Sequence, residues 1–132
     1  MEFMLDTNIC IYLINKQPIK IIKKLKSIKT SDICISSITS SELWFGVYKS
    51  SYPKQNSLAL TEFLSSINTV NFNDEAAINY GQIRAHLEKK GKIIGAMDML
   101  IGAHALAMNL TLVTNNIREF KRIPDLKVIN WV

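Results

Sequence analysis

The stretch IIGAMDMLIGAHALAMNLTLVT, residues 93–114, contains both kinds of element from which the fold is built. It predicts a helix from Ala96 to Met108 and, directly after it, a short apolar strand at residues 110–114. Twelve of the sixteen residues from 93 to 108 are apolar, and Asp98 is the only acid among them. A carboxylate in such surroundings costs several kcal/mol unless a cation or hydrogen-bond donors meet it. Asp98 is therefore interpreted either as a helix N-cap or as a metal ligand.

The same alternation of helices and short apolar strands runs through the rest of the chain. Strands are predicted at residues 2–5, 32–36, 67–72, 110–114 and 127–131. Helices are predicted at residues 8–15, 18–28, 40–50, 53–66, 74–90, 96–108 and 116–121. Strands separated by helices favour a mostly parallel sheet with helices on both faces. Because no internal repeat or Pro/Gly-rich linker interrupts the pattern, residues 1–132 are expected to form one α/β domain.

The composition is that of an ordinary folded protein with a basic balance. The 132 residues are 48% hydrophobic and 20% charged, and the two cysteines, Cys10 and Cys34, are expected to be buried thiols. No signal peptide is visible and no uncharged apolar run reaches membrane-spanning length, so a soluble cytoplasmic protein is expected. The formal net charge of +5 favours polyanionic partners, nucleic acids among them.

Several acids and amides follow directly after predicted strands. They are Asp6 after the first strand, Glu42 one turn into the helix after the second, and Asn115, Asn116 and Glu119 after the fourth. Parallel sheets bring the carboxyl ends of their strands to one edge, where sites form. Asp98 begins a helix that would pack beside them. Three or four carboxylates are therefore expected to converge at this edge.

Each acid also has a simpler interpretation. Asp6 and Asp98 are possible helix caps, since aspartate accepts hydrogen bonds from free backbone N–H groups. Thr39 and Glu42 have the spacing of a capping box. Glu119 has the alternative of an ordinary surface charge. These alternatives stay open for each residue taken alone.

Taken together, the acids indicate a metal site. Carboxylates gathered within a few ångströms repel one another unless cations neutralise them. Oxygen ligands without histidine or cysteine select Mg²⁺ or Mn²⁺ rather than zinc. Such a site can hold a phosphodiester, activate a water and stabilise the leaving oxygen. An acidic, metal-binding edge on a basic protein therefore predicts hydrolysis of nucleic acid.

Four segments carry a resemblance that extends from Met4 to Trp131. They read MLDTNICIYLI, SSITSSELWFGV, IGAMDMLIGAHALA and LVTNNIREFKRIPDLKVINW. In this order and spacing they closely resemble the PIN-domain ribonucleases, specifically the VapC-type toxins of bacterial type II toxin–antitoxin modules. The resemblance implies a three-layer α/β/α sandwich with a central, mostly parallel sheet. It also implies endoribonuclease activity that depends on Mg²⁺ or Mn²⁺.

The resemblance assigns roles to individual residues. It implies that the catalytic, metal-binding acids are Asp6, Glu42, Asp98 and Glu119, with Asn116 as a further metal or water ligand. Glutamate rather than aspartate at position 119 is expected to loosen a second metal position. Hydroxyl groups of Thr7 and Thr114 are expected to orient the first carboxylate or bound water, and Asn8 to cap the following helix at the rim of the site.

The resemblance also implies partners. Family members usually form homodimers and are blocked by a small VapB-type antitoxin, and the complex commonly binds its operator DNA. The expected path of the RNA substrate is lined by basic residues: Lys20, Lys23, Lys24, Arg118, Lys121 and Arg122.

Two rival functions remain at this point. A nucleic-acid-binding module would use the lysines without any metal. A phosphatase of another α/β family would also place an aspartate after the first strand, but it normally has a second aspartate two residues later, where this chain has Asn8.

Overall fold

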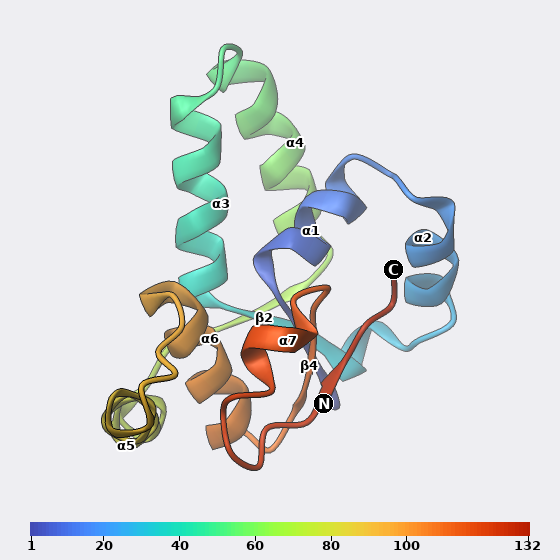
Figure 1. Ribbon diagram of the computed structural model, residues 1–132. Helices are drawn as coiled ribbons and strands as arrows, with labels where there is room; N and C mark the ends of the chain where they lie inside the picture. Colours follow the sequence, from blue (N-terminus) through green and yellow to red (C-terminus); the bar gives the residue numbers. More distant parts are fainter.

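Five parallel strands form the centre of the computed structural model, which describes residues 1–132 (Figure 1). The strands are β1 (Phe3–Leu5), β2 (Ile33–Ser36), β3 (Asn68–Val70), β4 (Thr111–Val113) and β5 (Val128–Ile129). Their order across the sheet is β3-β2-β1-β4-β5, and every neighbouring pair is parallel. The carboxyl ends of all five strands therefore meet at one edge, with β1 in the middle.

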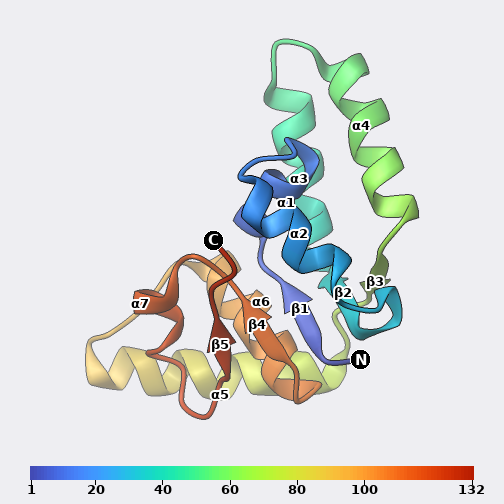
Figure 2. The ribbon, with the colours of Figure 1, turned by 90° about the vertical axis from the view of Figure 1, so that its right-hand side faces the viewer.

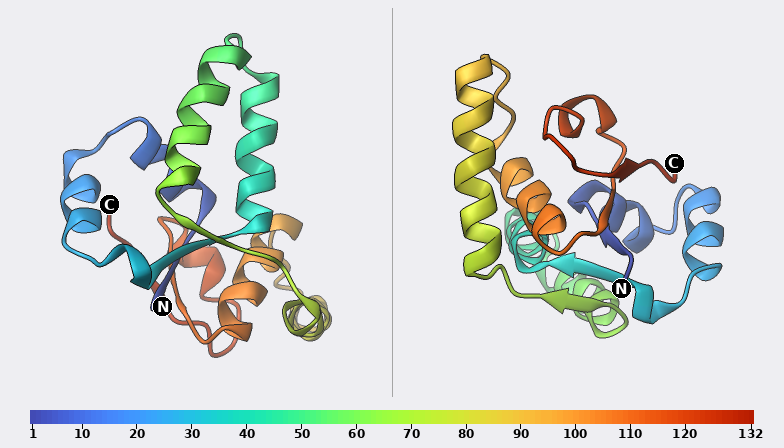
Figure 3. Two further views of the ribbon diagram at one scale, coloured as in Figure 1. Left: turned by 180° about the vertical axis from the view of Figure 1, so that it is seen from behind. Right: turned by 90° about the horizontal axis from the view of Figure 1, so that it is seen from below.

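Seven α-helices connect and cover these strands. They are α1 (Thr7–Ile14), α2 (Ile19–Lys26), α3 (Ser37–Lys49), α4 (Pro53–Ser65), α5 (Asp74–Lys90), α6 (Ala96–Ala107) and α7 (Ile117–Phe120). A turn of 3₁₀-helix at Thr30–Asp32 leads into β2. The α5 and α6 helices lie on one side of the sheet and α1 and α2 on the other, whereas the α3–α4 hairpin projects away from it (Figures 1 and 3). The α/β sandwich predicted from the sequence is confirmed.

Alternating side chains of the strands supply two separate cores. In β1, Met4 belongs to the core under α5 and α6, whereas Leu5 belongs to the core under α1, α3 and α4. In β4, Leu112 and Val113 divide in the same way. Successive side chains of a strand point to opposite faces, so a short, wholly apolar strand serves two layers at once.

One predicted helix begins three residues earlier than expected. The side chain of Ser36 accepts a hydrogen bond from the Ile38 N–H at 3.0 Å, so α3 begins at Ser37 rather than Ser40. Thr39 is consequently buried within the first turn. The capping box proposed for Thr39 and Glu42 is therefore wrong, and the Glu42 carboxylate is left for other contacts.

The α6 helix is packed closely on both sides. Its His104 is fully buried, lies 2.8 Å from the Ser36 hydroxyl through Nδ1, and has a pKa lowered by burial, as expected of a packed core histidine. Gly102 faces the segment after α7, where an added Cβ would lie 2.5 Å from Cδ1 of Ile123. Glycine at this position therefore lets α6 approach that segment closely.

Two further expectations concern the thiols and the membrane. Cys10 and Cys34 are buried and free, as predicted, and burial raises the pKa of both, that of Cys34 to about 11. Both side chains therefore remain thiols at neutral pH. None of the helices combines the length and the apolar character needed to cross a membrane.

Candidate active site

Asp6 is held in place at the carboxyl end of the central strand. Its Oδ1 accepts a hydrogen bond from the Thr7 N–H and its Oδ2 accepts one from the Thr114 hydroxyl, each at 2.8 Å. Only 4% of Asp6 is exposed, and burial, outweighing these hydrogen bonds, raises the pKa of its carboxyl group. Asp6 is the N-cap of α1, as one reading of the sequence expected. Asn8, expected to cap this helix, is instead exposed within its first turn, so that prediction is wrong.

A further hydrogen bond joins Glu42 to the start of α1. The Thr7 hydroxyl donates to Oε1 of Glu42 at 2.6 Å, which joins α1 to α3 across 35 positions of the sequence. The negative charge of Glu42 contributes to the raised pKa of Asp6, so the two carboxylates are close enough to repel each other. Thr7 and Thr114 thus orient the two acids that follow β1 and β2.

Asp98 lies in the first turn of α6 but does not cap it. The N-cap is Gly95, and the Asp98 carboxylate takes part in no hydrogen bond or ion pair. Burial raises the pKa of Asp98 to about 6, and the negative charges of Asp6, Glu42 and Glu119 add to this effect. The N-cap interpretation is therefore wrong, and Asp98 faces three other acids without a donor to satisfy it.

The residues after β4 complete this edge. Glu119 is half-buried on α7 and contributes negative charge at Asp98. Asn116 donates its backbone N–H to the Thr114 hydroxyl at 2.9 Å, whereas the side-chain amide of Asn115 donates to the Tyr12 hydroxyl at 3.0 Å. Thr114 therefore links the turn before α7 to Asp6, and Asn115 is directed towards α1.

The four acids Asp6, Glu42, Asp98 and Glu119 form what we call the acidic edge. The only ion pairs of the protein join Met1 to Asp32 and Arg84 to Glu88, so no lysine or arginine neutralises this edge. As the side chains stand, no three of the Asp, Glu, His and Cys groups are arranged to share one metal ion. The donors are nonetheless all hard oxygen atoms, and the nearby Cys10 stays protonated because burial and the charge of Asp6 raise its pKa. This donor set suits Mg²⁺ or Mn²⁺ rather than zinc.

The six basic residues predicted to line the RNA path belong to two separate hollows. Lys20, Lys23 and Lys24 lie beside Trp131 near the end of the chain. Arg118, Lys121 and Arg122 lie together on and after α7. The second hollow also contains basic side chains of α5 and of the turn after it, which sequence reasoning missed because their approach to α7 depends on long-range packing.

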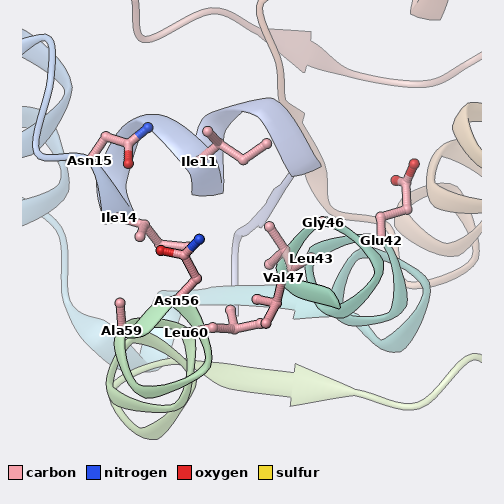
Figure 4. Close-up of a pocket in the computed structure, with 10 residues that line it drawn as sticks. All are labelled: Ile11, Ile14, Asn15, Glu42, Leu43, Gly46, Val47, Asn56, Ala59 and Leu60. Atoms are coloured by element: carbon pink, nitrogen blue, oxygen red, sulfur yellow. The ribbon is translucent and has the colours of Figure 1, made fainter. Parts of the chain in front are cut away.

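Sequence reasoning also missed a mainly apolar pocket of about 260 Å³ between α1, α3 and α4 (Figure 4). Glu42 lies at one end of it, and half of its ten lining residues are the large aliphatic side chains Ile11, Ile14, Leu43, Val47 and Leu60. The sequence did not indicate that three helices would leave a space between them.

The sequence matches the PIN domain family over residues 3–126. The chain is 50% identical to Ribonuclease VapC2 of Rickettsia felis and 43% identical to the tRNA(fMet)-specific endonuclease VapC of Salmonella typhimurium, in each case over 99% of this chain and 98% of the relative. The crystal structure of VapBC2 from Rickettsia felis, bound to a DNA fragment from the promoter, contains a chain that superposes with a TM-score of 0.93 at 48% identity, with full coverage of both chains. The protein therefore belongs to the PIN-domain family, among the VapC-type ribonucleases.

Proposed function

We infer that this protein is an endoribonuclease toxin that hydrolyses RNA phosphodiester bonds with Mg²⁺ or Mn²⁺ at the acidic edge. The observation that carries this proposal is the meeting of four carboxylates with no positively charged side chain to neutralise them. The relatives named as ribonucleases share the whole length of the chain and support the same reaction class. Because RNA is the proposed substrate, we also propose that the protein acts in the cytoplasm.

The residues present fit a divalent ion, and each has a distinct task. Asp6, Glu42 and Asp98 would hold the first ion, with Glu119 or Asn116 supporting a second ion or its waters. A Mg²⁺ or Mn²⁺ ion bound there supplies a Lewis acid that lowers the pKa of water and stabilises the leaving oxygen. Four ionised carboxylates carry a charge of −4, which two divalent cations balance.

The protein's own part is to orient these oxygen atoms before the substrate arrives. The two hydrogen bonds to Asp6 leave that carboxylate little freedom to rotate. The Thr7 hydroxyl holds Glu42 from one side. Asp98, which has no hydrogen bond to give up, is free to turn its oxygen atoms towards an incoming cation. The site thus combines two fixed acids with one adjustable acid.

The substrate and partners are proposed from the relatives. The Salmonella relative is named as specific for tRNA(fMet), so tRNA(fMet) is the first RNA to test. The Rickettsia VapBC2 complex was crystallised on promoter DNA, and we propose a VapB-type antitoxin and operator DNA as partners of this protein too. The homodimer expected from the sequence stays a prediction.

The test compares wild type with Asp6→Asn, a change that keeps a capping side chain and removes a charge. Each purified protein is incubated with tRNA(fMet) or total RNA in Mg²⁺, Mn²⁺ or EDTA, and the new 5′ ends are sequenced. Defined cleavage sites are expected only for wild type with metal. Equal cutting by Asp6→Asn, or full cutting in EDTA, contradicts the proposal. Hydrolysis of a small phosphomonoester without RNA cleavage would instead support the phosphatase alternative.

A further inference from the structure

A hollow of about 340 Å³ with a basic lining lies between the end of α5 and α7. We call it the basic hollow, and its lining residues are His86, Leu87, Lys90, Lys92, Arg118, Lys121 and Arg122. In two views the end of α5 and α7 lie on the same side of the molecule, with the turn after α5 beside them (Figures 2 and 3). Leu87 is the only hydrophobic residue of the lining.

The positive charges of the basic hollow are not neutralised within the protein. Its lining contains no Asp or Glu, and none of its lysines or arginines takes part in either ion pair of the protein. Five cationic side chains that share one hollow repel one another at neutral pH. An anion that entered the hollow would relieve this repulsion, so the arrangement favours a negatively charged ligand.

The basic hollow is joined to the acidic edge in two ways. Arg118 directly precedes Glu119 in α7 and Lys121 is the C-cap of this helix, so one short helix and its cap contribute to both. Arg122 donates a hydrogen bond from Nη1 to the Ile93 carbonyl at 3.2 Å, which fixes the turn that leads through Gly95 into α6 and Asp98. The basic hollow and the acidic edge are therefore built on the same two segments of the chain.

The chemistry of the lining indicates which part of such a molecule is recognised. The lining contains no Phe, Tyr or Trp, and six of its seven residues are basic or histidine side chains suited to phosphate oxygens. Lysine and arginine bind phosphate oxygens irrespective of the base attached. We propose that the basic hollow binds the phosphates of the RNA substrate next to the cleaved bond. This rests on the proposed ribonuclease function and makes the contact independent of sequence.

The lysines of α2 are the competing path. Lys20, Lys23 and Lys24 line a different hollow with Ile129, Asn130 and Trp131, and the two hollows have no lining residue in common. None of the four acids lies on α2. The direct link through α7 and Ile93 therefore favours the basic hollow over α2 as the position of the RNA strand.

The test removes two exposed charges, one from each wall, in Lys90→Ala/Lys121→Ala. The matched control is Lys29→Ala/Lys127→Ala, because these exposed, unpaired lysines precede β2 and β5 at the opposite edge of the sheet. For the test variant we expect KM for RNA to rise about tenfold with kcat unchanged. The slope of log KM against log salt concentration should fall by about 1.4, because each lost phosphate contact of a single strand contributes ~0.7. The control is expected to match wild type.

RNA binding is measured apart from cleavage, so that a failure of the basic-hollow proposal can be told from a failure of the ribonuclease proposal. RNA affinity of the same pairs is determined by fluorescence anisotropy in an Asp98→Asn background. If wild type cuts RNA but the test variant keeps the KM and salt slope of the control, the basic hollow does not bind substrate. A larger rise in KM for Lys23→Ala/Lys24→Ala would likewise overturn the proposal in favour of α2. If wild type does not cut RNA but the test variant loses RNA affinity, the ribonuclease proposal fails and the basic hollow stands as an RNA-binding surface.

Discussion

Two aspartates of the acidic edge stand at the starts of helices, yet their surroundings differ completely. Asp6 caps α1 and accepts hydrogen bonds from Thr7 and Thr114, whereas Asp98 follows the Gly95 cap of α6 and accepts none. Both carboxyl groups have a raised pKa, with burial as the main cause. Asp6 therefore supports both the fold and the site, whereas the carboxylate of Asp98, which accepts no hydrogen bond, has a role only in the site.

The largest expected effect is on catalysis by Asp98→Asn. The substitution preserves shape but removes the charge that would hold the metal, and we expect RNA cleavage to fall by about 100-fold or more, as when other preorganised electrostatic partners are removed. Initial rates with saturating Mg²⁺ measure the loss. The fold should be intact by circular dichroism, and Glu62→Gln, which removes an exposed carboxylate on α4, serves as the control. Full activity of Asp98→Asn would refute its assignment as a ligand.

Comparing alanine with asparagine at each position separates the two roles. At position 6, asparagine keeps a capping oxygen and alanine does not, so Asp6→Ala should be less stable than Asp6→Asn by about 1–2 kcal/mol. At position 98 no hydrogen bond is lost and alanine has the better helix propensity, so Asp98→Ala should be at least as stable as Asp98→Asn. Urea unfolding of the metal-free proteins measures all four. Equal differences at the two positions would show that the contrast has no energetic meaning.

A smaller effect is expected when the hydrogen bond between the Thr7 hydroxyl and Glu42 is removed. Thr7→Val removes the hydroxyl that donates to Glu42 but keeps the shape of the side chain. We expect metal-dependent cleavage to fall about tenfold, at the low end for groups that orient metal ligands. The half-saturating Mg²⁺ concentration should rise, and Thr7→Ser should restore both values. Failure of serine to rescue would mean that packing, not the hydrogen bond, is responsible.

The smallest effect is a change of stability with pH. The pKa of Asp98 is about 6 in the folded protein against an ordinary value of 3.8, so the folded state holds this proton more tightly. Below pH 3.8 both states are protonated; as the pH rises through 6 the folded state must release the proton, and stability is lost. After allowance for solvent screening at this half-buried side chain, wild type should lose about 1 kcal/mol relative to Asp98→Asn between about pH 4 and 7.

Metal-free protein in EDTA is needed for this measurement, because a bound cation would reverse the preference. The raised pKa of Asp6 acts in the same direction in both proteins and largely cancels in the difference. A pH-independent difference between wild type and Asp98→Asn would mean that Asp98 ionises as in water.

The sequence predicted the order of helices and strands because each has a clear period or a strong local end signal. The α5 helix, for example, begins after Asn73, whose side chain accepts a hydrogen bond from the Ala76 N–H, and is followed by Gly91 in a left-handed conformation. Both residue types are typical of these helix ends. The start of α3 was misplaced because the serines that precede Thr39 offer several equivalent caps. Asn8 was misassigned for a similar reason, since Asp6 satisfies the helix start first.

The position of each acid after its strand was also predictable, because parallel strands have only one carboxyl edge. The orienting role of Thr7 towards Glu42 was not visible in the sequence, since it depends on how α1 and α3 pack. The same holds for His86, Lys90 and Lys92, which α6 and β4 separate from α7 in sequence. Local patterns identify which residues carry charge, but not which charges of different helices share one hollow.

Gly102, which has no side chain, affects more than the packing of α6. Asp98 lies at the start of α6, and Glu119 lies four residues before Ile123, which Gly102 of α6 contacts. The width of this contact therefore influences how far apart the two acids stand. A methyl group at position 102 would clash with Ile123 and push α6 away from the segment that follows α7. A residue outside the acidic edge thus influences the spacing of the oxygen atoms that we propose as ligands of a divalent ion.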